Sequence, residues 1–101
     1  DIPIPSGTTL DAQNSLILGG GDQWTGRLVL NINQSHSEAF ALYTTQMPQF
    51  GWEPIASVQS ETSLLTFVRG DRATTIEIRE GRAISGCLVR ITMTPQVRTT
   101  N

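Results

Sequence analysis

The chain has 101 residues, a formal net charge of −2 and 38% hydrophobic residues, which is enough for one small domain with its own core. All seven basic residues are arginines and the sequence pI is about 5.2, so a strongly basic, nucleic-acid-binding surface is not expected. No apolar run approaches the roughly 18 residues that cross a bilayer, and a single cysteine excludes an internal disulfide or a cysteine-based metal cluster.

The first segment, residues 1–15, is expected to be an extended arm, because its two prolines restrict φ and remove backbone donors. Its start without an initiator Met or a signal sequence predicts a trimmed or mature form. Leu16–Leu18 is a short strand candidate, and the glycines at 19–21 are typical of a hinge or wide turn. The residues after these glycines have a strand-like pattern and include no lysine, so a phosphate-binding loop is not predicted.

Apolar and polar side chains alternate from Arg27 to Asn33, which predicts a half-buried strand. Ser35 and Glu38 then have the spacing of a capping box. A helix is therefore expected over residues 36–47, ended by a proline, with a buried stripe that contains Phe40, Tyr43 and Met47 beside Ala39.

Further strands are expected in quick succession, at residues 53–59, 63–69, 73–79 and 87–94. Their short connections predict an antiparallel meander. The fold class is therefore α+β: a two-layer sandwich in which one helix packs on a mostly antiparallel sheet of about five strands. This single domain spans 16–95, and 96–101 is expected to be a flexible tail. The sheet face away from the helix is predicted to carry Thr75, Glu77, Arg79, Arg90, Thr92 and Thr94.

The tripeptide Arg69-Gly70-Asp71 is an integrin ligand in animal matrix proteins. Here it lies between two alternating strands, where Gly70 can supply a positive φ and Asp71 is a common turn residue. We therefore interpret it as a hairpin turn.

The sequence offers few groups for catalysis. His36, the one histidine, is expected to be solvated at the start of the helix, and Cys87 alternates with apolar residues as a core side chain would. A nucleophilic pair of Cys87 with His36 is a formal alternative. No catalytic residue, metal ligand or cofactor is predicted.

Two tryptophans remain, Trp24 after the glycines and Trp52 after the helix. Both fit core positions, because aromatic rings dominate small cores. The alternative is that one is an exposed binding anchor, since tryptophan is enriched at interaction hot spots.

Several short motifs resemble small bacterial exported lipoproteins of uncharacterised function: Trp24-Thr25-Gly26-x-Leu28, Met47-Pro48-x-Phe50-Gly51-Trp52, Leu65-Thr66-Phe67-x-Arg69-Gly70-x-Arg72, Ile76-x-Ile78 and Val89-x-Ile91-x-Met93. The architecture is also similar to the domains of the C lipoprotein of the outer-membrane β-barrel assembly machinery. In the lipoproteins a lipid-bearing cysteine usually precedes a proline-rich arm. The resemblance implies export to the periplasm or outer membrane of a Gram-negative bacterium, with tethering through an upstream lipidated cysteine that this chain lacks. It carries over no catalytic residue.

The leading hypothesis is a non-catalytic cell-envelope module that binds envelope proteins through a sheet edge, the uncovered sheet face and the Trp24 loop. Nucleic acid is not expected as a partner. The alternative is a small-ligand-binding domain with a pocket between helix and sheet, near Trp52 and Tyr43. The candidate partner-binding residues are Trp24, Arg79, Arg90 and Thr92.

Overall fold

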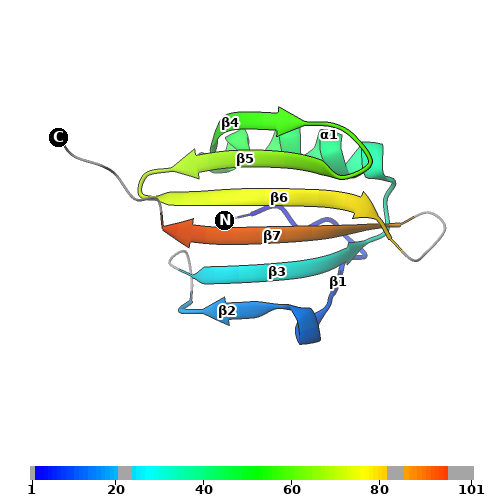
Figure 1. Ribbon diagram of the computed structural model, residues 1–101, viewed down its shortest axis with the longest axis horizontal. Helices are drawn as coiled ribbons and strands as arrows, with labels where there is room; N and C mark the ends of the chain where they lie inside the picture. The colour runs from blue at the N-terminus through cyan, green and yellow to red at the C-terminus, as the bar shows by residue number, and fades with distance from the viewer. Residues whose placement is uncertain (1, 21–23, 82–85, 96–101) are drawn as a thin grey trace.

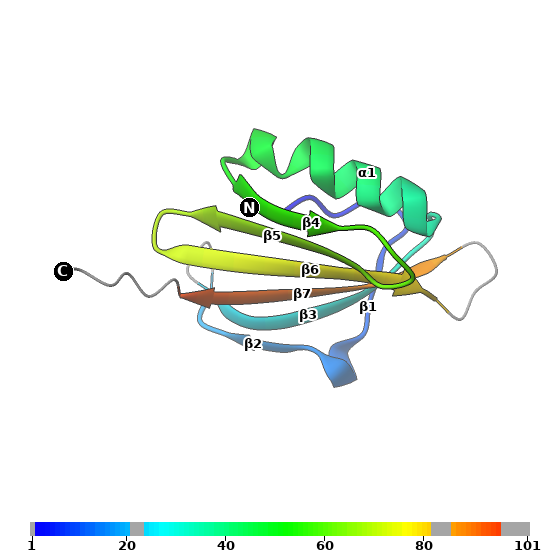
Figure 2. The same ribbon diagram turned by 45° about the horizontal axis from the view of Figure 1, so that its top comes forward.

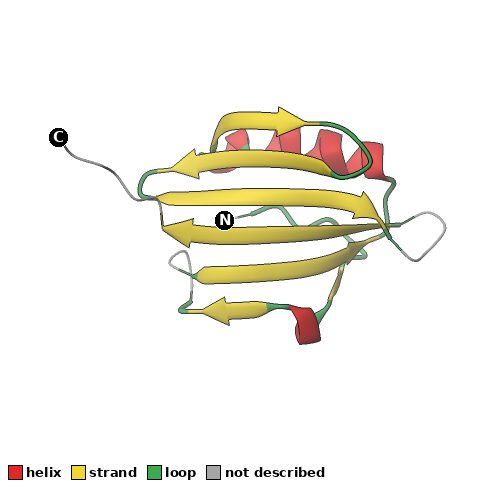
Figure 3. Ribbon diagram, in the orientation of Figure 1, coloured by secondary structure: helices red, strands yellow, loops and turns green. Residues whose placement is uncertain are grey.

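The structure, a computed structural model, describes residues 2–20, 24–81 and 86–95, and the predicted tail at 96–101 lies outside these ranges. The described part of the chain forms two layers, one helix and one antiparallel sheet (Figures 1 and 3). The elements in chain order are β1 (Thr9–Leu10), η1 (Ala12–Asn14), β2 (Leu16–Leu18), β3 (Thr25–Ile32), α1 (His36–Gln46), η3 (Pro48–Phe50), β4 (Glu53–Val58), β5 (Ser63–Arg69), β6 (Arg72–Glu80) and β7 (Cys87–Pro95). The α+β class is as predicted.

The sheet of the described residues has seven strands rather than about five, in the order β1-β3-β7-β6-β5-β4, with β2 also paired to β3. One edge of β3 pairs with β7, so β1 and β2 lie one after the other along its second edge. The segment expected as an arm thus carries a strand and a 3-10 turn. Two residues of β1 are too few to show a strand period, so only pairing with β3 identifies them.

The helix forms where the capping box predicted it. The backbone N–H of Glu38 donates to Ser35 Oγ at 3.1 Å, and the N–H of Ser35 donates to Glu38 Oε1 at 3.0 Å. These bonds lower the pKa of Glu38 below its ordinary value. Helix α1 gives way to η3 at Pro48, and Gly51, with φ of 90°, turns the chain back toward the sheet. Within the described ranges no helix is long and apolar enough to span a bilayer.

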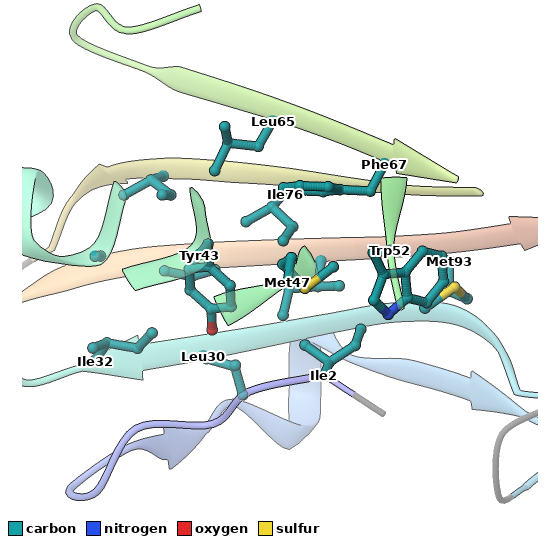
Figure 4. Packing of buried hydrophobic residues seen from close by; sticks show 14 of the residues in the cluster. Ile2, Leu30, Ile32, Tyr43, Met47, Trp52, Leu65, Phe67, Ile76 and Met93 are labelled. Atoms are coloured by element: carbon teal, nitrogen blue, oxygen red, sulfur yellow. The ribbon is translucent and has the colours of Figure 1, made fainter. Parts of the chain in front are cut away.

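The core lies between α1 and the sheet (Figure 4). Ala39, Tyr43 and Met47 are fully buried, whereas Phe40 is only partly buried against this cluster. From the amino-terminal segment Ile2 joins the core as well. The last three strands alternate as their sequence pattern predicts, and every residue of their core-facing set is buried: Leu65, Phe67, Thr74, Ile76, Ile78, Cys87, Val89, Ile91 and Met93.

The helix covers one face of the sheet and leaves the opposite face without a second layer in the described part of the chain (Figure 2). Strands β3 and β4 run in the same direction, because four antiparallel pairings link them through β7, β6 and β5. The chain therefore has to cross the sheet between them, and α1 makes that crossing.

Candidate functional site

The uncovered side of the sheet, here called the open face, is defined on its central strands by nine outward residues. Strand pairing aligns them in three rows across β3, β7 and β6. The rows are Arg27–Thr92–Thr75, Val29–Arg90–Glu77 and Asn31–Leu88–Arg79. Each row contains one arginine, and the arginine moves one strand further across the sheet from row to row.

Glu77 links two of these arginines. Its Oε2 accepts a hydrogen bond from Arg90 Nε at 3.0 Å, a second from Arg90 Nη2, and a longer one of 3.4 Å from Arg79 Nη2. The side chains of Arg79 and Arg90 keep 47% and 37% of their surface exposed. Such half-exposed pairs are worth only about 0.2–1 kcal/mol, so the cluster is not explained as a major source of stability.

One side of the open face is bounded by η1. Asp11 caps this turn, since its carboxylate accepts from the Asn14 backbone N–H at 3.3 Å and from Asn14 Nδ2 at 2.8 Å. Ser15 Oγ accepts a hydrogen bond from the Val29 N–H at 2.9 Å. Val29 lies in the gap between the part of β3 that pairs with β1 and the part that pairs with β2. Arg27 Nε in turn donates to the Asn14 carbonyl at 3.3 Å. These bonds hold η1 against β3 and bury Val29.

Between η1 and the far end of β6 the open face is hollowed, with a cavity volume of about 700 Å³. Its lining is mostly polar and includes all three open-face arginines together with the carboxylates of Asp11, Glu77 and Glu80. This volume is in the range of ligand and peptide subsites, roughly 300–1,000 Å³.

Three of the four candidate partner-binding residues lie on the open face, and two of them, Arg79 and Arg90, line the hollow. Arg79, Arg90 and Thr92 occupy neighbouring rows of the open face, as their alternation predicted. The fourth, Trp24, is only 7% exposed and belongs to the core cluster. This burial corrects the expectation of an exposed anchor. The Trp24 carbonyl accepts a 3.0 Å hydrogen bond from Arg72 Nη2.

Sequence reasoning missed Arg27 and the whole of η1 as parts of this surface. Arg27 begins the alternating run in which Val29 and Asn31 point outward. The two-residue period of a strand could therefore have placed Arg27 on the same face. The Asp11-x-x-Asn14 spacing, with an Asp that caps a turn, was the signal for η1.

The Arg69-Gly70-Asp71 segment is the hairpin turn that was predicted. Arg69 pairs with Arg72, and Gly70 has φ of 62°. The guanidinium of Arg69 lies 4.5 Å from the Trp52 ring centroid, and its Nη1 donates to the Phe50 carbonyl at 2.8 Å. Gly70 and Asp71 are exposed, whereas the Arg69 side chain is held against its own domain.

The hydrogen bond found for the His36 ring among the described residues goes to Ser63, and not to Cys87. His36 is half-buried rather than solvated, and its Nε2 lies 2.7 Å from Oγ of Ser63, a fully buried residue. Cys87 is buried on the core face, where desolvation raises its pKa. Among the residues that the structure describes, no group of three or more His, Cys, Asp or Glu side chains is placed to hold a metal.

The region between helix and sheet that was considered for a small ligand is filled by side chains. Tyr43 and Trp52 are 0% and 1% exposed and pack with the core residues shown in Figure 4. Burial also raises the pKa of Tyr43 well above its usual range, and proximity to Cys87 adds to this shift.

Comparison of the chain with protein-family models, with curated proteins and with solved structures found no match.

Proposed function

We propose that this domain is a non-catalytic module of the bacterial cell envelope that binds a protein partner on its open face. The observation that carries the proposal is that α1 packs on only one of the two sheet faces. One face is packed by α1, while the other presents a hollow with three arginines and no covering layer in the described part of the chain. A surface that combines apolar floor residues with half-exposed arginines is typical of protein interfaces.

The β2 edge extends this surface. Leu16, Ile17 and Leu18 are 59%, 48% and 58% exposed, although all three are large aliphatic residues. On the opposite edge of the sheet, β4 carries Pro54 and a register shift beside it, both of which discourage strand addition. The β2 edge is therefore the one that a partner strand can extend.

Site-specific crosslinking tests this proposal. A photoreactive amino acid is placed at Thr92 on the open face or at Leu18 on β2, and for comparison at Thr45, an exposed residue of α1. In a bacterial envelope extract, the first two positions should crosslink to the same protein and Thr45 should not. Crosslinks of equal yield from all three positions, or from none, would contradict an interface on the open face.

The envelope location is supported by the lipoprotein resemblance and has its own test. Expression of the full-length gene product in bacteria fed an alkyne fatty acid should label the protein at a cysteine upstream of this chain. A product without label, recovered from the cytoplasm, would remove the envelope part of the proposal and leave the binding surface to be judged by the crosslinks.

A further inference from the structure

We infer that the partner presents an extended acidic segment, whose carboxylates are bound in the open-face hollow by Arg27, Arg90 and Arg79. This inference rests on the proposed function and names the chemistry of the partner at the same surface. It is carried by three observations: the hydrogen-bond donors left unused in the hollow, the spacing of the three arginines, and the apolar floor between them.

Two of the three carboxylates that line the hollow, those of Asp11 and Glu77, are hydrogen-bonded within the domain. Both oxygens of Asp11 accept hydrogen bonds from Asn14, and Glu77 Oε2 accepts from Arg79 and Arg90. The third lining carboxylate, Glu80, is at the exposed end of β6 and makes no side-chain hydrogen bond with the described residues.

The arginines keep donors to spare. Each guanidinium has five N–H groups. Among the described residues Arg27 uses only Nε, on the Asn14 carbonyl, and Arg79 uses only Nη2, in a long bond to Glu77. Arg90 has Nη1 left beside its two bonds to Glu77. The arginines therefore have N–H donors available to acceptors of a bound partner, although the formal charges of the lining residues balance.

The arginines also have the spacing of an extended chain. They stand in three successive rows, Arg27 on β3, Arg90 on β7 and Arg79 on β6. Rows are two residues apart, which is about 6.7 Å along a strand, and neighbouring strands are about 4.8 Å apart. One step along this diagonal is therefore roughly 8 Å. Alternate side chains of an extended peptide are about 6.7 Å apart, so flexible arginines can meet acids at every second position.

The floor between the arginines suits such a segment. Val29 and Leu88 line the hollow and offer apolar contact. In the row of Arg27, the hydroxyls of Thr92 and Thr75 can pair with backbone groups of an extended chain. A second copy of this chain would place its own open-face arginines opposite these arginines. It would offer no regular run of acidic side chains to bind them.

Fluorescence anisotropy with two labelled nonapeptides, one alternating Thr and Glu and the other alternating Thr and Gln, tests the inference. The folded domain should bind the Glu peptide at least about tenfold more tightly at low salt, and the difference should shrink at about 0.5 M NaCl. Arg27→Gln and Arg79→Gln should each weaken Glu-peptide binding roughly fivefold, since each removes one charge-assisted contact. Glu53→Gln, on β4 at the opposite sheet edge, is a control away from the open face and should not weaken binding.

Equal affinity for the two peptides, or arginine variants that bind as the wild type does, would overturn the inference, provided that circular dichroism shows the variants folded. Displacement of the Glu peptide by inorganic phosphate at equal charge concentration would assign the hollow to small anions instead. Self-association that Arg27→Gln abolishes would assign the open face to a second copy. If Thr92 still crosslinks to a protein while the Glu peptide shows no preference, the proposed function stands and only the acidic partner is excluded.

Discussion

The carbonyl oxygen of Leu16 lies only 2.0 Å from the position where Gly26 would carry a Cβ atom if it were any other residue. Gly26 sits in β3 with φ of 136°, a conformation that residues with a side chain rarely adopt. The pairing of β2 with β3 therefore depends on this glycine, and so does the exposed aliphatic edge that a partner strand would extend.

Gly26→Ala should detach β2 and lower the free energy of unfolding by about 1–3 kcal/mol, because the new methyl group meets backbone and the φ angle is strained. Urea denaturation measures the loss. Gly20→Ala is the control, since nothing lies within 4 Å of a Cβ at that position, and it should change stability by less than about 0.5 kcal/mol. Similar effects of both variants would show that β2 is not held by close approach to Gly26.

Tyr43→Phe should stabilise the domain at neutral pH. The phenol oxygen is buried and has no hydrogen-bond partner among the described residues, so its removal relieves the cost of desolvation. The expected gain is about 1 kcal/mol in the free energy of unfolding at pH 7. A loss of stability in thermal or urea unfolding would instead reveal a partner for this hydroxyl.

The same residue predicts a decline of stability in alkali. Because burial raises the pKa of Tyr43 above its ordinary value of 10.0, the unfolded chain ionises first. The free energy of unfolding is therefore not changed by this ionisation below about pH 10, and it falls as pH rises beyond that value. Cys87, whose pKa is also raised, adds a loss that begins near its ordinary value of 9.0. Since this is the sole tyrosine, tyrosinate absorbance should appear only as the protein unfolds. Absorbance that rises near pH 10 in the folded protein would contradict burial.

The capping box predicts the opposite dependence in acid. The pKa of Glu38 is lowered by its bonds to Ser35, so the charged carboxylate stabilises the fold above the ordinary carboxyl pKa of 4.5, and this stabilisation is lost as pH falls through the folded value. Melting temperatures of wild type and Glu38→Gln should differ at pH 7 and converge toward pH 3. Ser35→Ala should cost about 1 kcal/mol at pH 7. A difference in melting temperature between wild type and Glu38→Gln that grows in acid would contradict stabilisation by the charged carboxylate.

Cys87 should be unreactive in the native protein. Its side chain is buried on the core face, and the raised pKa keeps the thiol protonated at neutral pH. Labelling with a thiol reagent at pH 7.5 should reach completion only in denaturant. Rapid native labelling would place the thiol at the surface and reopen the pairing of Cys87 with His36.

The elements that local patterns can encode were predicted well. The capping box between Ser35 and Glu38 located the helix, because both of its hydrogen bonds join residues three apart. Alternation located the long strands and their inward faces, and Gly70 with Asp71 located the hairpin turn. In these cases the physical cause lies within a few residues of the effect.

The misses have distant causes. Strand β1 exists only because β3 offers its free edge, and η1 lies against the open face because Ser15 and Asn14 bond to β3 residues more than ten positions away. Trp24 is buried in the core cluster, and its carbonyl accepts a hydrogen bond from Arg72, 48 residues later. His36 is half-buried, and its ring is hydrogen-bonded to Ser63, which is also far away along the chain.

By itself, then, the sequence determined the periodicities, the cap and the turn, and thereby one amphipathic helix and a set of half-buried strands. Which strand lies beside which was decided by tertiary pairing, because hydrogen bonds between strands carry no local signature until the whole sheet is assembled. The diagonal of Arg27, Arg90 and Arg79 exists only in that assembly, since β3, β7 and β6 are neighbours in space and far apart along the chain.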